Sequence, residues 1–297
     1  MENVVPEMPT AHRAVHPEVG RLDMSVVDPP SLHPRIAVSG LCLPLLSAVD
    51  AVAEIAALGV GQTSITAARL RESGPEEVLG ACQLNNVAVI TTTGSIQLSR
   101  SADLDELHDR ARADIDQAAT VGAASLYTLT GPRVGADWAG SVDAYVEFVG
   151  PLVDYAVGKS LALAVEPTNW LYADVNFVHS FHDALLLASR AGLGVCLDLF
   201  HVWTESGLRE DIAKNLPLIS NVQLSDMTAG ARSLPCRTVP GEGAMPIEAL
   251  LHWLLDAGYE GMFEVELGGP RSDEIGHQQA TAQAVAWLNA VLLKLGA

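Results

Sequence analysis

Short apolar runs alternate with longer amphipathic segments from residue 35 to the end of the chain. Eight of the runs have the length of a strand, and residues 161–165 are apolar throughout, as is typical of a parallel strand buried on both faces. The predicted strands are Ile36–Leu43, Gln62–Thr66, Val87–Thr92, Ser125–Leu129, Leu161–Glu166, Gly194–Leu199, Asn221–Ser225 and Met262–Leu267. The segments between them predict helices, including Ala48–Leu58, Leu104–Thr120, Val142–Val157, His182–Ala191 and Ile247–Ala257.

Eight strand–helix units in a chain of 297 residues predict an α/β fold, the (β/α)8 TIM barrel, over residues 34–297. A doubly wound open sheet is the main alternative, but no G-x-G-x-x-G turn follows the first predicted strand. Residues 1–33 are rich in proline and histidine and show little periodicity. We expect this segment to be an N-terminal arm outside the barrel, either disordered or packed on a neighbouring subunit.

The composition narrows the class of protein. Charged residues make up 18% of the chain, below the roughly 25% of an average protein, which indicates a well-packed enzyme. The net charge of −19 disfavours a nucleic-acid partner, because such partners are bound through basic surfaces. No apolar run approaches the roughly 20 residues of a membrane span, and no signal peptide is evident. The four cysteines form no C-x-x-C pair, so we expect free thiols and a cytoplasmic location.

Polar side chains stand at the ends of the last four predicted strands. Glu166, Asp198, Gln223 and Glu266 each follow apolar residues there. The carboxyl ends of barrel strands form the active-site face, and a carboxylate held there is costly unless it is paired or binds a metal. Four oxygen donors from adjacent strands predict a site for a hard divalent cation. Glu264 shares a face with Glu266 but lies deeper, so we expect it to support the ligands rather than join them.

The order and spacing of several short motifs resemble the xylose isomerase-like TIM-barrel superfamily, often described as sugar phosphate isomerases and epimerases. The resemblance covers the chain from about residue 35 to the C-terminus and rests on Glu166-Pro, Asp198-x-x-His201, Gln223-x-x-Asp226, Arg237-x-x-Pro-Gly-Glu-Gly243 and Gly258-Tyr-Glu-Gly261. By position, it implies the metal ligands Glu166, Asp198, Gln223 and Glu266.

Gln223 departs from the pattern of the family, because many epimerases carry histidine at this position. A neutral oxygen in place of an imidazole nitrogen favours Mg²⁺ or Mn²⁺, with Co²⁺ or Zn²⁺ as alternatives. Glutamine here is also similar to the 3-dehydroshikimate dehydratase branch. The resemblance further implies that His201 contacts substrate or assists proton transfer and that Arg237 holds a substrate oxygen. Asn169 and Trp203 follow ligand-bearing strands and are predicted to contact substrate.

The function that these features predict is a metal-dependent isomerase or epimerase of a small polyhydroxy carbonyl compound, acting by proton abstraction next to a metal-bound carbonyl. Glu166 and Glu266 are the predicted acid and base, and one takes a proton that the other returns. Loss of a β-hydroxyl, with His201 as the predicted base, would instead make the protein a lyase, such as a 3-dehydroshikimate or inosose dehydratase or a C-glycoside-cleaving enzyme. A non-catalytic binding barrel is the third hypothesis. The substrate is expected to be a polyol, keto-sugar or keto-acid, and the resemblance implies a dimer or tetramer.

Overall fold

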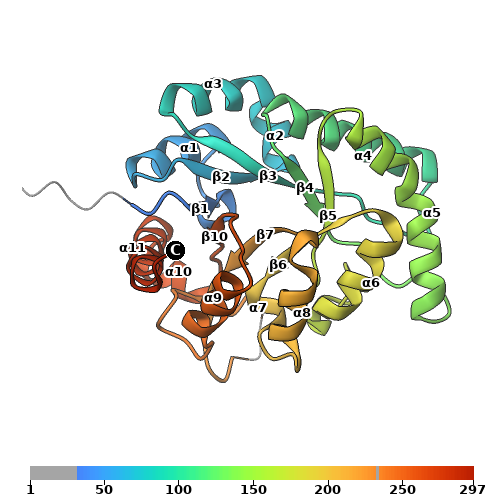
Figure 1. Cartoon of the computed structure of the whole chain (residues 1–297). Helices are drawn as coiled ribbons and strands as arrows, with labels where there is room; N and C mark the ends of the chain where they lie inside the picture. The colour runs from blue at the N-terminus through green and yellow to red at the C-terminus, as the bar shows by residue number, and fades with distance from the viewer. Residues whose placement is uncertain (1–31, 232–233) are drawn as a thin grey trace, which may run out of the picture. The chain divides into compact units, whose positions relative to one another are not determined.

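The sheet closes into a barrel of eight parallel strands in the computed structural model, which describes residues 32–231 and 234–297 (Figure 1). Pairing of the first strand with the last, with Ile36 opposite Phe263, closes the barrel and excludes an open sheet. The predicted fold is therefore confirmed. The barrel strands are β1 (Ile36–Ser39), β2 (Gln62–Thr66), β3 (Ala88–Gly94), β4 (Ser125–Thr128), β5 (Ala162–Val165), β6 (Gly194–Asp198), β7 (Ile219–Leu224) and β10 (Phe263–Val265).

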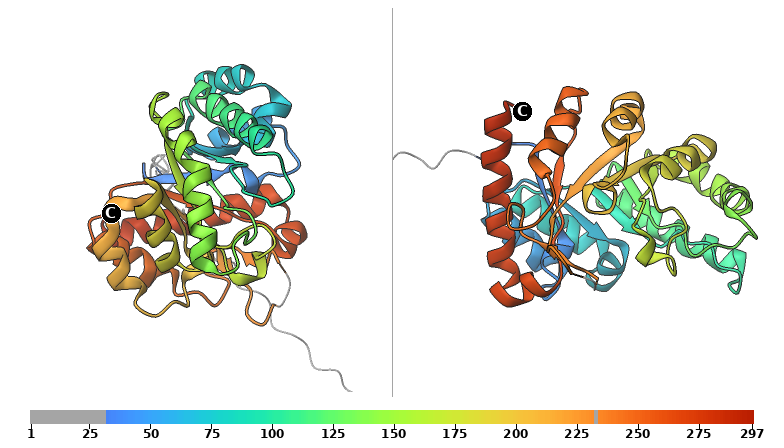
Figure 2. Two further views of the ribbon diagram at one scale, coloured as in Figure 1. Left: turned by 90° about the vertical axis from the view of Figure 1, so that its right-hand side faces the viewer. Right: turned by 90° about the horizontal axis from the view of Figure 1, so that it is seen from below.

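Helices surround the strands, and the long C-terminal helix runs along the outside of the barrel (Figure 2). Polar side chains cap the N-termini of several helices. At the helix Leu104–Thr120, for example, the side chain of Asp103 accepts hydrogen bonds from the backbone amides of Asp105 and Glu106. The helices are α1 (Ala48–Ala57), α2 (Ala67–Ser73), α3 (Pro75–Asn85), α4 (Leu104–Thr120), α5 (Trp138–Val157), α6 (Phe181–Ala191), α7 (Leu199–Val202), α8 (Leu208–Asn215), α9 (Ile247–Asp256), α10 (Pro270–Ile275) and α11 (His277–Leu295), with short 3₁₀ turns η1 (Gly40–Cys42), η2 (Trp170–Tyr172) and η3 (Leu216–Leu218).

The core has two parts of different character. Apolar side chains fill the layer between strands and helices, as Val52, Leu152 and Leu250 do without any exposure. Inside the barrel, buried polar side chains bond to one another, and the hydroxyls of Ser125 and Thr91 lie 2.8 Å apart. A polar barrel interior provides hydrogen-bond partners for the charged groups at the barrel mouth.

A two-stranded antiparallel sheet, which the sequence pattern did not predict, lies between β7 and α9. It pairs β8 (Asp226–Met227) with β9 (Arg237–Thr238). Both strands are only two residues long, too short for a periodicity to show. This pairing brings Arg237 back beside the end of β7.

The first described residues belong to the barrel rather than to an arm. The amide of His33 donates to Oδ1 of Asn289, and Nε2 of His33 lies 2.8 Å from the carbonyl oxygen of Ala297. The described barrel unit spans Leu32–Ala297. Residues 1–31 of the predicted arm lie outside the described residues. Within the described part of the chain, no helix has the length and apolar character needed to cross a membrane.

Candidate metal centre

Three carboxylates gather at one mouth of the barrel. Glu166 follows β5, Asp198 ends β6 and Glu266 follows β10, and each is buried. Parallel strands deliver them to the same face because their carboxyl ends all point that way. One ligand atom each from Glu166, Asp198 and His201 lies within 4.8 Å of the others. The structure thus brings together the residues predicted at these strand ends.

Arg237 is the positive charge of this cluster. Its Nη2 atom donates to Oδ2 of Asp198 and to Oε1 of Glu266, the latter at 3.0 Å. Its Nη1 atom donates to the hydroxyl of Ser225 at 3.0 Å, and the guanidinium lies 4.3 Å from the ring centroid of Phe200. Burial alone would raise the pKa of Asp198, but the charge of Arg237 beside it holds that pKa below its usual value.

The positive charge near Glu166, Glu264 and Glu266 does not offset the effect of burial on their pKa values. Burial raises the pKa of Glu166 well above its usual value, and repulsion from Glu266 and Asp198 adds to this. Burial likewise raises the pKa of Glu266 to about 7, although Arg237 opposes it, and raises that of Glu264 to about 8.

Glu166 makes the clearest case for a cation. Its carboxylate accepts no hydrogen bond from the described residues, and Nε2 of His201 is 3.8 Å from its Oε1 atom. A buried carboxylate without a partner is costly. Since Glu166, Asp198 and Glu266 all offer oxygen, the donor set fits a hard divalent cation.

Gln223 is turned differently from the sequence-based expectation. Its Nε2 atom donates to Oε2 of Glu266 at 2.8 Å, to Oε2 of Glu264 at 3.1 Å and to the hydroxyl of Tyr127 at 3.0 Å. Its oxygen, the predicted ligand atom, instead accepts from Sγ of Cys196 at 3.1 Å. Two desolvated carboxyl groups attract N–H donors, so the amide presents its nitrogen to them. In this orientation Nε2 of Gln223 bridges Glu264 and Glu266, and the role of Gln223 as a metal ligand stays a prediction.

His201 has its protonation state defined by its neighbours. The backbone amide of Asn169 donates to Nδ1 of His201 at 3.3 Å, and Nδ2 of Asn169 lies 3.2 Å from the same atom. Burial lowers the pKa of His201 to about 4, so the ring is neutral. With Nδ1 accepting, the proton resides on Nε2, which lies 3.7 Å from Oδ2 of Asp198. A protonated Nε2 cannot bind a metal or act as a base, so His201 faces the site as a hydrogen-bond donor.

The two remaining predicted substrate contacts are placed elsewhere. Asn169 forms the N-cap of η2, and its side chain lies behind the lining residue His201, with Nδ2 3.2 Å from Nδ1 of that ring. Trp203 is half-buried and packs against the apolar core. Neither side chain lines the cavity at the barrel mouth, and a substrate contact of either residue stays a prediction.

A cavity of about 550 Å³ opens above the carboxylates, and we call it the metal-centre cavity. Its floor includes Glu166, His201, Arg237 and Glu266. The residues that line it are Leu41, Pro44, Leu45, Thr93, Tyr127, Leu129, Glu166, Thr168, Tyr172, His201, Pro235, Arg237, Glu266, Leu267, Gly268, Gly269, Asp273 and His277.

Two tyrosines that line this cavity were not predicted as site residues from the sequence. Tyr127 is buried on β4 and meets Gln223, whereas Tyr172 packs edge-on against His201 with ring centroids 5.3 Å apart. Tyr172 lies six residues after Glu166, in a loop whose path no periodicity shows. For Tyr127 a signal existed, because it is the one large polar side chain in an otherwise small or apolar strand.

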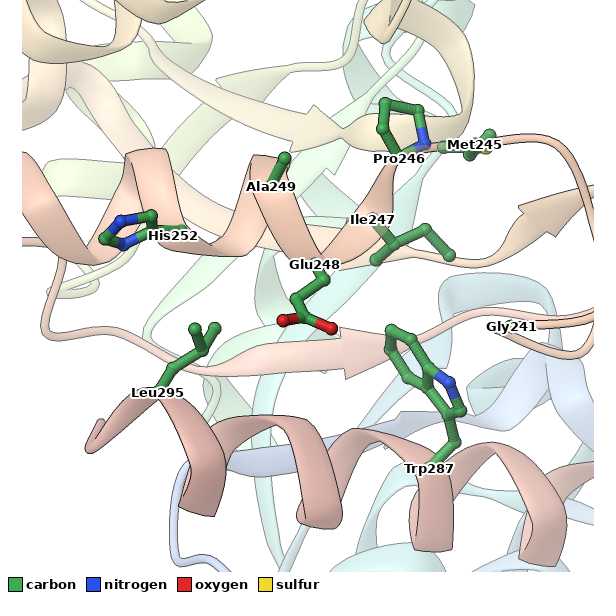
Figure 3. A pocket seen from close by; sticks show the side chains of 9 residues that line it. All are labelled: Gly241, Met245, Pro246, Ile247, Glu248, Ala249, His252, Trp287 and Leu295. Atoms are coloured by element: carbon green, nitrogen blue, oxygen red, sulfur yellow. The ribbon is translucent and has the colours of Figure 1, made fainter.

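Another cavity, of about 530 Å³, lies on the outside of the barrel between α9 and α11 (Figure 3). It shares no lining residue with the metal-centre cavity. Its acidic residue, Glu248, forms an ion pair with Lys294 at 2.5 Å. No cluster of buried carboxylates faces it among the described residues.

Comparison with known proteins agrees with the fold. The sequence matches the family described as "Xylose isomerase-like TIM barrel" over residues 49–291. An inosose isomerase of Bacillus licheniformis is 27% identical over 129 residues, which are 42% of this chain and 46% of that protein, so the match spans about half the length of this relative.

Two solved structures superpose on most of the barrel. Protein SMc04130 of Sinorhizobium meliloti 1021 has a TM-score of 0.75 at 20% identity, over 88% of this chain and 98% of that one. The IOLI protein, solved with a zinc atom, has a TM-score of 0.76 at 15% identity, over 88% of this chain and 99% of that one. At these identities the likeness shows the fold alone.

Proposed function

The chain belongs to the xylose isomerase-like TIM-barrel family, and from that membership we propose that it is a divalent-metal-dependent isomerase or epimerase of a small polyhydroxy carbonyl compound. The observation that carries the proposal is the cluster of three buried carboxylates around one guanidinium, two of which, Glu166 and Glu266, line the metal-centre cavity together with that guanidinium. The inosose isomerase relative supports a cyclic polyol ketone as one substrate to test.

The proposed ligands of the cation are Glu166, Asp198 and Glu266, with Gln223 as the fourth after a half-turn of its amide. When bound, a divalent cation polarises a substrate carbonyl and holds a neighbouring hydroxyl in place. The zinc atom of the IOLI structure supports a divalent ion in this family. Oxygen-only ligands favour Mg²⁺ or Mn²⁺ for this chain, with Co²⁺ or Zn²⁺ as alternatives.

The side chains of the protein supply proton transfer and orientation. Glu166 and Glu266 extend from β5 and β10, which are separated in the barrel by β6 and β7, so they approach a substrate from different directions. We propose that one removes the proton next to the carbonyl and the other returns it. Arg237 binds a substrate oxygen through its guanidinium, and Nε2–H of His201 donates to a second one.

A lyase is the second candidate, and the state of His201 is what favours it. Its Nε2–H can donate a hydrogen bond to a β-hydroxyl and hold that group in place as it departs. A carboxylate takes the proton next to the carbonyl and, as a carboxylic acid, passes it to the hydroxyl as the carbon–oxygen bond breaks, so that water leaves and the double bond forms. The same side chains therefore serve isomerisation when the hydroxyl stays and dehydration when it leaves.

The test uses the full chain loaded with Mn²⁺ in D₂O, with scyllo-inosose, D-fructose and 3-dehydroshikimate as probes. Deuterium entering the carbon next to the carbonyl, together with an isomeric product, supports the isomerase. Loss of water identifies a lyase. Glu266→Gln should abolish either reaction, whereas Glu210→Gln, at an exposed position on α8, should leave it unchanged. No exchange and no product with any probe would leave the binding barrel as the better description.

We also propose a reducing compartment such as the cytoplasm, because all four cysteines are unpaired and buried. A dimer or tetramer and the absence of a nucleic-acid partner stay predictions. Sedimentation of the purified protein, alone and with duplex DNA, tests both.

A further inference from the structure

A smaller cavity of about 370 Å³ adjoins the metal-centre cavity, and we call it the annex. Leu45, Asp273 and His277 line both cavities, so the two are neighbouring compartments of one depression. The annex is completed by Leu43 and Leu46 on one side and by residues 276–278 on the other. It lies where the connections that follow β1 and β10 meet, because these two strands are paired in the barrel.

The wall of the annex that follows β1 is held firmly in place. Arg69 donates through its guanidinium to the carbonyl oxygens of Gly40, Leu43 and Leu46. Cys42 ties the same segment to the end of β10, since its thiol donates to the carbonyl of Val265 at 3.3 Å and accepts from the amide of Leu267 at 3.2 Å. Five contacts of this kind are expected of a preformed binding surface rather than a loose loop.

The chemistry of the annex differs from that of the metal centre. Leu45 is 85% exposed, although it stands at the junction of two cavities. Across from it, Nε2 of His277 lies 3.2 Å from Oδ1 of Asp273. The annex therefore offers an apolar wall with polar groups at its edge, a combination that suits a flat apolar ring bearing few hydrogen-bonding groups.

We propose that the substrate has two parts: a polyhydroxy carbonyl ring at the metal centre and an apolar, aryl-like substituent that occupies the annex. This inference rests on the proposed function for the first part only. Pockets of roughly 300–1,000 Å³ hold ligands of drug size, and the metal-centre cavity and the annex, at about 550 and 370 Å³, offer a separate compartment for each part. A substituent on that ring covers Leu45 and removes its apolar surface from water.

Titration calorimetry on the Mn²⁺-loaded chain tests this with phenyl and methyl β-D-glucopyranoside. These probes differ only in the substituent, and neither has the carbonyl needed for turnover. The phenyl glycoside should bind roughly tenfold more tightly, because its ring buries apolar surface against Leu45. Leu45→Trp fills the annex and should remove that difference. Leu84→Trp is the matched control, since Leu84 is 87% exposed on α3, and it should preserve the difference.

Equal affinities, no binding of either glycoside, or a preference that survives Leu45→Trp would overturn the inference. A concentration-dependent dimer that Leu45→Trp dissociates, with equal affinities for the two probes, would assign Leu45 to a second copy of the chain and overturn it as well. The D₂O exchange experiment fails independently: a phenyl preference that depends on Leu45, without proton exchange on any carbonyl probe, would keep the annex and discard the isomerase.

Discussion

The backbone amide of Asn169 donates a hydrogen bond to Nδ1 of His201, with 3.3 Å between the two nitrogens. A backbone N–H is always a donor, so this contact alone assigns the imidazole proton to Nε2. Because burial lowers the pKa of His201 to about 4, we expect a neutral ring with its proton on Nε2 throughout pH 5.5–8. Nitrogen-15 NMR of the imidazoles measures this directly.

The His201→Gln variant identifies the resonance of this ring by its disappearance. A charged ring at pH 6.5, or a proton on Nδ1, would contradict the assignment. In the second case Nε2 would be free to bind a metal, and His201 would join the ligand set that its distance from Glu166 permits.

Glu264 gives the metal-free protein a pH-dependent stability. Its pKa is raised by burial from 4.5 to about 8, so the folded state keeps a proton that the unfolded state has lost. The resulting stabilisation is complete below pH 4.5 and disappears as the pH rises to about 8, at roughly 1.4 kcal/mol per pH unit. Urea unfolding in the presence of a chelator should show a lower free energy of unfolding at pH 8.5 than at pH 6.5.

Glu264→Gln removes this titration. The free energy of unfolding should then fall less steeply with pH between those two values, by a slope that corresponds to about one proton. His201 does not interfere there, because both of its states are neutral above its unfolded pKa of about 6.5. An unchanged slope in Glu264→Gln would show that Glu264 is ionised in the folded protein.

The loop that follows Arg237 depends on one carboxylate. Asp226 accepts hydrogen bonds from the backbone amides of Met227, Gly241, Gly243 and Met245 at 2.8–3.0 Å. A Cβ atom at position 243 would meet Oδ1 of Asp226 at 2.2 Å. Gly243→Ala should therefore lower the free energy of unfolding by about 1–3 kcal/mol and raise KM, since Arg237 precedes this loop.

Gly150→Ala is the control for that substitution. Position 150 is inside α5, and a Cβ there would meet nothing within 4 Å. It should be neutral or stabilise the protein by roughly 0.5–1 kcal/mol. If both alanines behave alike in urea unfolding, the close approach of Gly243 to Asp226 has no energetic weight.

Arg237 should separate metal binding from turnover. Removing its charge in Arg237→Met relieves the repulsion between the guanidinium and a cation at Asp198 and Glu266, so Mn²⁺ should bind at least as tightly. Turnover should fall by about 100-fold or more because a substrate oxygen loses its donor. Calorimetry with Mn²⁺ and steady-state kinetics measure the two effects.

Arg209→Met, at an exposed position on α8, serves as the matched control and should change neither. A folded Arg237→Met protein that no longer binds Mn²⁺ would mean that Arg237 positions the carboxylates instead of the substrate. Circular dichroism establishes the folding of each variant before titration.

The sequence pattern predicted the barrel because its signals are local. Each strand is a short apolar run, and β2 and α4 have the predicted bounds. The carboxylates could be predicted for the same reason, since the end of a strand is recognisable in the sequence and parallel strands bring such ends together. Glu166, Asp198 and Glu266 therefore lie at one mouth, as expected.

Features that depend on contacts between distant segments could not be predicted from the sequence in this way. The direction of the Gln223 amide depends on Glu264 and Cys196, which no local pattern connects to it. Trp203 follows α7 and packs against the core, because the path of that short helix decides where its side chain points. The roles of these residues follow from three-dimensional neighbours rather than from spacing.

The closure of the barrel between β1 and β10 has a consequence for synthesis of the chain. While the ribosome is still making residues 263–265, β1 and β7 each lack a neighbour on one side. Exposed edges of this kind pair with other chains, so the nascent protein is most prone to aggregation just before it is finished. The same strand, β10, carries Glu264 and leads directly to Glu266. The pairing of β10 with β1 therefore closes the barrel and brings these two carboxylates to the metal centre in one late step of folding.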